Sequence, residues 1–122
     1  MGYRSDVRIA TTRKGYDLMC EHVDLASKGV DGYPLMSTNR EPDFFDEENG
    51  CVAFGWDSIK WDNGYYRGVT NVDDALRKLA EAGIPYEFCR VGEEYEDIEF
   101  SACGDNETLS LHIEPITCID IV

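Results

Sequence analysis

The sequence predicts an α+β fold, with a mainly antiparallel sheet of about five to six strands and two helices packed on one face. Two segments carry apolar residues at helical spacing, and several short segments alternate apolar with polar residues as strands do. The order is strand, helix, loop, strand, helix and then four strands, which favours antiparallel pairing. A chain of 122 residues has the usual size of one domain, so we expect residues 1–122 to form a single domain.

The first strand is expected over residues 6–11, where apolar and polar residues alternate. Thr11 or Thr12 follows it and can cap a helix, because a Thr hydroxyl accepts a hydrogen bond from a free backbone N–H in the first turn. The helix is predicted to run to about Lys28, and Gly29 is a residue type that commonly ends one.

A long acidic loop is expected over residues 30–50, because Gly, Pro and Asn residues interrupt the whole stretch. Loops of this length in a compact domain usually bind something or move. Alternation returns over residues 51–61, which we predict as a strand. Asp62-Asn63-Gly64 after it is typical of a turn.

The second helix is predicted from Thr70 or Asn71, where Asn71 and Asp74 resemble a capping box, to a stop at Gly83. The rest of the chain is predicted as strands. They cover residues 86–91, 97–103, 109–113 and 116–122, the last of which is rich in β-branched residues, as a central strand covered on both faces would be.

The charge of the chain limits its partners. Asp and Glu number 25 against 11 Lys and Arg, which gives a net charge of −14. Nucleic acids and anionic membranes are bound by basic surfaces, so direct binding to either is not expected. No apolar run approaches the roughly 20 residues of a membrane-spanning helix, and no signal-peptide pattern opens the chain. We therefore expect a cytoplasmic protein.

Signatures of catalysis or metal binding are missing from the sequence. The five cysteines are scattered, without a C-x-x-C pair, which predicts reduced thiols rather than disulfides or a zinc site. His22 and His112 have no sequence neighbours that would form a nucleophile and an orienting group around them. We predict no catalytic residues, no metal ligands and no cofactor.

Two short acidic runs hold ten of the 25 acidic residues, and neither run contains Lys or Arg. For the second run, residues 93–99, three interpretations stay open: a solvated turn that protects a sheet edge, a cation site on Glu96, Asp97 and Glu99, or an anionic face that docks on a basic protein groove. The candidate partner-binding residues are Glu41, Asp43, Asp46, Glu47 and Glu48 in the first run, and Glu93, Glu94, Glu96, Asp97 and Glu99 in the second.

A group of aromatic residues around the predicted turn is an alternative site. If some of them line a cleft, they could hold a planar ligand, and an arginine beside them could supply charge. These alternative ligand-binding residues are Trp56, Trp61, Tyr65, Tyr66 and Arg67.

Three segments carry a resemblance to other proteins: the opening Gly2-Tyr3-Arg4-Ser5-Asp6-Val7, the stretch from Trp56 to Trp61 with the pattern Trp-Asp-x-x-Lys-Trp, and the stretch from Tyr86 to Glu99. Together they cover about a third of the chain. They resemble segments of a group of small uncharacterised phage and prophage proteins. The resemblance implies an accessory phage protein, a class in which some members block host defences such as CRISPR systems. It implies no site residues.

The acidic runs and this resemblance together predict an inhibitor that binds a host or bacterial-defence protein with a basic surface, in the manner of an anti-CRISPR DNA mimic, and that is not an enzyme. A sponge for a small ligand such as a signalling nucleotide is the first alternative. A small carboxylate- or metal-dependent enzyme is the second. Nothing in the sequence specifies an oligomeric state.

Overall fold

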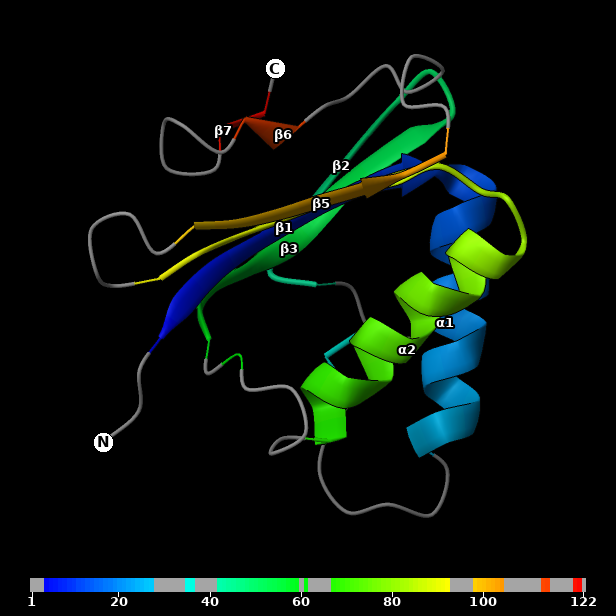
Figure 1. Cartoon of the computed structure of the whole chain (residues 1–122), viewed down its shortest axis with the longest axis horizontal. Helices are drawn as coiled ribbons and strands as arrows, with labels where there is room; N and C mark the ends of the chain where they lie inside the picture. The colour runs from blue at the N-terminus through cyan, green and yellow to red at the C-terminus, as the bar shows by residue number, and fades with distance from the viewer. Residues whose placement is uncertain are drawn as a thin grey trace.

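The computed structural model describes residues 4–27, 35–36, 42–59, 61, 67–92, 98–104, 113–114 and 120–121. The two helices lie on one face of a sheet, and a short two-stranded ladder lies on the other side (Figure 1). The predicted α+β class, with an antiparallel sheet and two helices on one face, is confirmed. The elements are β1 Ser5–Thr12, α1 Arg13–Ser27, β2 Phe44–Glu48, β3 Cys51–Ile59, α2 Arg67–Glu81, β4 Tyr86–Val91, β5 Ile98–Cys103, β6 Ile113–Glu114 and β7 Asp120–Ile121.

Strand β1 lies at the centre of the sheet, whose order is β2-β3-β1-β4-β5 with every neighbouring pair antiparallel. Val7 and Ile9 are fully buried on the helix side, and Ala10 is fully buried on the other side. The prediction that residues 116–122 form a central strand is wrong. Within that range the structure describes only β7, which pairs with β6 in a separate ladder. Apolar composition alone did not distinguish a terminal hairpin from a central strand.

The helix ends follow local capping chemistry. The backbone N–H of Gly15 donates to Thr12 Oγ1 at 3.0 Å, which confirms Thr12 as the cap of α1. Helix α2 begins at Arg67, before the predicted start, and Asn71 is buried inside it, so the expected capping box is wrong. Gly83 ends α2 as predicted, with a φ of 74° and with the N–H of Ile84 donating to the carbonyl of Leu79 at 2.9 Å.

The expected loop over residues 30–50 is wrong for its last part, because residues 44–48 form β2. Asn49 and Gly50 join β2 to β3 with φ values of 52° and 78°. Positive φ at both central residues is characteristic of a type I′ hairpin turn, for which Asn-Gly is the preferred sequence. In the sequence the pair stands among other loop-type residues, which conceal it as a hairpin turn. The expected turn at 62–64 and the strand at 109–112 lie outside the described residues.

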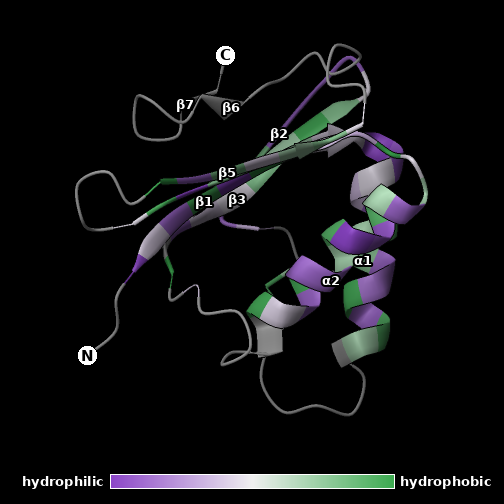
Figure 2. Cartoon of the chain, in the orientation of Figure 1, coloured by the Kyte–Doolittle hydropathy of each residue, from purple (hydrophilic) through white to green (hydrophobic). Residues whose placement is uncertain are grey.

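Aromatic rings fill the layer between the helices and the sheet. Tyr16 of α1 contacts Phe45 and Phe54 edge to face, with ring centroids 5.2 and 5.0 Å apart. The series continues from Phe54 through Trp56 and Trp61 to Phe88 at 5.7–5.9 Å. Such contacts add to the free energy of burying the rings. Figure 2 shows hydrophobic and hydrophilic residues interleaved along the helices and strands, as expected when each element buries one side.

Gly55 marks the closest approach of β3 to β1. A Cβ atom at this position would overlap the backbone carbonyl of Val7, and it would lie 3.0 Å from the Cα of Arg8. The register places Arg8, Gly55 and Phe44 in one row across three strands. Because Gly55 has no side chain, the Arg8 guanidinium reaches Phe44, with its central carbon 4.6 Å from the ring centroid.

Replacing Gly55 by Ala should lower the free energy of unfolding by about 2 kcal/mol or more, because the new methyl group can fit only if β1 and β3 separate. Gly50→Ala is the control: it has open space and a positive φ, and should cost about 1 kcal/mol. Urea denaturation followed by tryptophan fluorescence measures both. Equal losses would contradict the close approach at Gly55.

Candidate protein-binding surface

Strand β2 is an outer strand of the sheet and carries most of the first acidic run. Asp46, Glu47 and Glu48 lie on the strand, Asp43 directly precedes it, and all four are exposed. Glu41 lies outside the described residues. Charged side chains on an outer strand hinder edge-to-edge pairing with other sheets. They also place carboxylates where another protein can reach them.

The pairing of β2 with β3 distributes these carboxylates over both faces. Asp46 lies opposite Ala53 and Glu48 opposite Cys51, so both are on the face without helices. Glu47 lies opposite Val52, a core residue beneath the helices. The first run therefore presents Asp46 and Glu48 together, with Glu47 turned towards α1.

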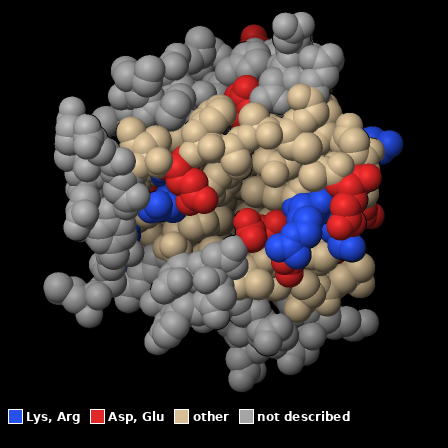
Figure 3. Space-filling view, in the orientation of Figure 1, with Lys and Arg blue, Asp and Glu red and all other residues tan. Residues whose placement is uncertain are grey.

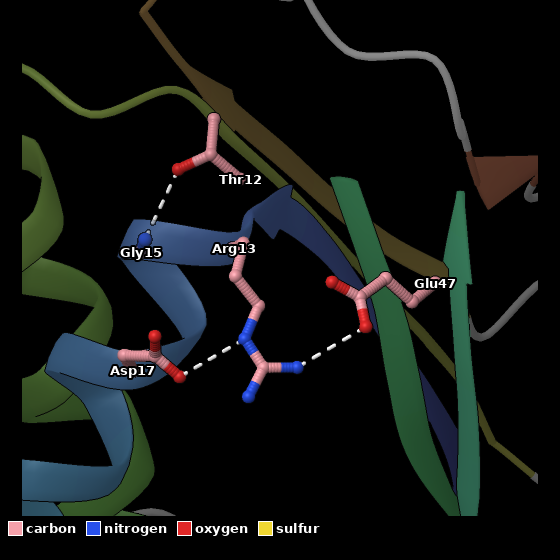
Figure 4. A network of polar contacts seen from close by, with 5 residues as sticks. All are labelled: Thr12, Arg13, Gly15, Asp17 and Glu47. Carbon is pink, nitrogen blue, oxygen red and sulfur yellow. Dashed lines mark hydrogen bonds and ion pairs between the residues drawn. The ribbon is translucent and has the colours of Figure 1, made fainter. Parts of the chain in front are cut away.

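Arg13 fixes Glu47 against the start of α1 (Figure 4). Its Nη1 lies 3.2 Å from Glu47 Oε1, and its Nε lies 3.2 Å from Asp17 Oδ1. The backbone N–H of Arg13 also donates to the carbonyl of Gly50 at 2.8 Å. These contacts attach the β2–β3 hairpin to the helix and engage Glu47. Among the described residues, neither Asp43 nor Asp46 forms an ion pair.

The basic side chains of the described residues are mostly engaged within the fold. Figure 3 shows basic groups over the helices in contact with acidic ones. The ion pairs besides those of Arg13 include Arg8–Asp57 at 2.9 Å, Arg77–Asp73 at 4.0 Å, Arg77–Asp74 at 3.4 Å, Lys78–Glu81 at 3.6 Å and Arg90–Glu99 at 3.1 Å. Most of the cations in the described part of the chain are thus used in contacts within the fold.

The described part of the second acidic run lies far from the first. Glu93, Glu94, Glu96 and Asp97 are outside the described residues, and Glu99 is on β5. Four inter-strand steps separate β2 from β5, or about 19 Å at the usual strand spacing. Glu48 and Glu99 also lie towards opposite ends of the sheet, near Cys51 and Arg90 respectively. These two carboxylates do not form one surface.

Glu99, the described member of the candidate cation site, is engaged by Arg90. The Arg90 Nε donates to Glu99 Oε1 at 3.1 Å, and Nη1 donates to Ser5 Oγ at 3.0 Å. Within the described ranges, no three His, Cys, Asp or Glu side chains come together as metal ligands.

The aromatic candidates that the structure describes belong to the core. Trp56 is 3% exposed, and its indole N–H donates to the backbone carbonyl of Leu35 at 3.0 Å. Trp61 is half-buried and packs against the same core. Tyr65 and Tyr66 lie outside the described residues, and of Arg67 only the backbone, the first residue of α2, is described.

Ile98 and Phe100 on β5 are surface residues that sequence reasoning missed. Both are nearly half exposed, at 46% and 45%. Their alternation with polar residues resembles that of a strand with one buried face, so the pattern itself gave no sign of exposure. Only the position of β5 at the sheet edge reveals it.

The cysteines do not form a reactive site in the described residues. Cys20, Cys51 and Cys89 are buried, Cys103 is half-buried, and each is a free thiol. Burial raises the pKa of Cys89 to about 11 and also raises the pKa of Cys20. A thiol with a raised pKa stays protonated at neutral pH and is a poor nucleophile. His22 is half-buried on α1, and His112 is outside the described residues.

Cys89 in the native protein should resist iodoacetamide at pH 8 and react fully in urea, as read by peptide mass spectrometry. The burial that raises its pKa is lost on unfolding, so the unfolded thiol ionises near its ordinary value of 9.0. Its contribution to stability should be complete below pH 9 and should decline between pH 9 and about 11. Rapid labelling of Cys89 in the folded state would show that this face of the sheet is open.

Comparison with known proteins adds no relative: no family model, curated protein or solved structure matches the chain. Neither helix in the described part combines the length and apolar character needed to cross a membrane. The function is therefore inferred from the chain's own residues and their arrangement.

Proposed function

We propose that the chain is an acidic binding protein of phage type, which docks β2 on a basic surface of a host or bacterial-defence protein and inhibits it. One observation carries this proposal: Asp43, Asp46, Glu47 and Glu48 are all exposed around an outer strand, and within the described residues neither Asp43 nor Asp46 forms an ion pair. Arg8, which lies against Phe44 of the same strand, is paired with Asp57.

The carboxylates on the face without helices form a small anionic patch. Asp46 and Glu48 are two residues apart on this face, which separates them by about 7 Å along a strand. A basic groove could contact both of them at once, with the net charge of −14 accelerating the encounter.

The alternatives receive no added support from the described residues. The small-ligand site would need its tryptophans at a cleft, yet Trp56 is in the core. The candidate cation site of the metal-dependent enzyme would need the Glu99 carboxylate, yet Glu99 is paired with Arg90. Protein binding through β2 is thus the function that the geometry favours.

Replacing Asp43 and Asp46 by Asn and Glu48 by Gln should weaken partner binding by at least about tenfold, because interfacial charges contribute to encounter and affinity. The matched control removes three helix carboxylates with Glu21→Gln, Asp74→Asn and Glu81→Gln, so both variants change the net charge equally. Each protein is used as bait in nuclease-treated bacterial lysate, and retained proteins are quantified by mass spectrometry. Affinities are then measured with the purified partner.

We expect the wild type and the control variant to retain at least one basic protein in common. The β2 variant should fail to retain that protein. That protein should also bind duplex DNA in competition with the chain. Equal retention by all three baits, or equal loss from both variants, would mean that the acids of β2 have no specific role and serve only solubility.

A further inference from the structure

Strand β5 forms the other edge of the sheet and carries fewer charged side chains than β2. It is hydrogen-bonded to β4 on one side, and no other described strand pairs with it. The β2 edge carries the exposed charges Asp46, Glu47 and Glu48, which discourage added strands. The charged residue described on β5 is Glu99, and Arg90 neutralises it. Of the two edges, β5 is therefore the one suited to accept another strand.

Ile98 and Phe100 extend an apolar strip to this edge. Ile98 lies opposite Val91 and Phe100 opposite Cys89, and both pairs are on the face without helices. Ala10, Cys89 and Val91 pack together on that face beside them. Ile98 and Phe100 keep 46% and 45% of their surface exposed. An added strand would place alternate side chains against these two residues and would bury surface that the monomer leaves in water.

The charge of the chain indicates what kind of strand would bind. With a net charge of −14, a cationic segment is attracted and a second copy of the same chain is repelled. Side chains of an added strand would point alternately to the two faces of the sheet. Those on the face of Ile98 and Phe100 should be apolar, and the alternate ones would lie on the opposite face, with Glu99. Basic residues fit the second set, because the chain as a whole is anionic and Glu99, though paired with Arg90, keeps 59% of its side chain exposed.

We propose that β5 binds an extended segment of a partner protein in which apolar residues alternate with Lys or Arg, by strand addition at the sheet edge. Backbone hydrogen bonds along β5 provide affinity, and Ile98 and Phe100 select the apolar residues. This surface is separate from the β2 surface of the proposed function. Either can fail without the other.

The test uses a fluorescein-labelled peptide of alternating Lys and Val, eight residues long, blocked at both ends and followed by anisotropy with the intact chain. Two control peptides accompany it: one has the same composition with four Lys before four Val, and one has its central Val residues replaced by Pro. The alternating peptide should bind about tenfold more tightly than either, because alternation and backbone donors are both required.

Ile98→Thr with Phe100→Thr should weaken binding of the alternating peptide by about tenfold, since Thr keeps the strand preference and loses the apolar contact. The matched control is Leu18→Gln with Leu25→Gln, which removes two exposed apolar side chains from α1 and should leave binding unchanged. Circular dichroism verifies that the variants fold.

Equal binding of the alternating and block peptides would overturn the proposal, since charge alone would then explain the association. Binding that the β5 variant retains in full would also overturn it. In sedimentation velocity the chain should be a monomer. A dimer that the two Thr substitutions dissociate would show that β5 pairs with a second copy instead.

Discussion

The double pairing of β1 with β3 and β4 determines which strands lie at the edges of the sheet and which surfaces stay exposed. Because β1 takes the central position, β2 and β5 become the two edges of the sheet. The acidic run around β2 and Glu99 on β5 are consequently separated by the width of the sheet. The two edges therefore expose different side chains: β2 exposes carboxylates, and β5 exposes an apolar strip. A basic partner that contacts both must span the sheet.

The centre of the sheet also limits which residues are available for binding. Tyr16, Phe54 and Trp56 close the layer under the helices, so Trp56, one of the aromatic residues that could suggest a ligand site, stabilises the fold instead. Gly55 permits β3 to approach β1, and it leaves Arg8 free to reach Phe44 and Asp57. The cations nearest the core thus serve internal contacts, and the surface keeps the surplus of negative charge.

Local chemistry made much of the fold predictable, whereas the candidate site was predictable only in part. Thr12 and Gly83 identified a helix start and a helix end, and the alternation over residues 86–91 identified β4. Alternation does not reveal which strands become neighbours, because partners are chosen by packing of the whole sheet. The separation of Glu48 from Glu99, and the exposure of Ile98, both follow from strand order. Asn49-Gly50 was a usable hairpin signal, but the acids before it have low strand preference and concealed β2.

Hydrogen–deuterium exchange of the chain, free and bound to its captured partner, locates the docking surface. If the β2 edge is the docking surface, amides in peptides covering residues 43–50 should exchange more slowly in the complex, while those of α2 should be unchanged. Protection confined to the helices, with residues 43–50 exchanging as fast as in the free chain, would show that β2 is not the docking surface.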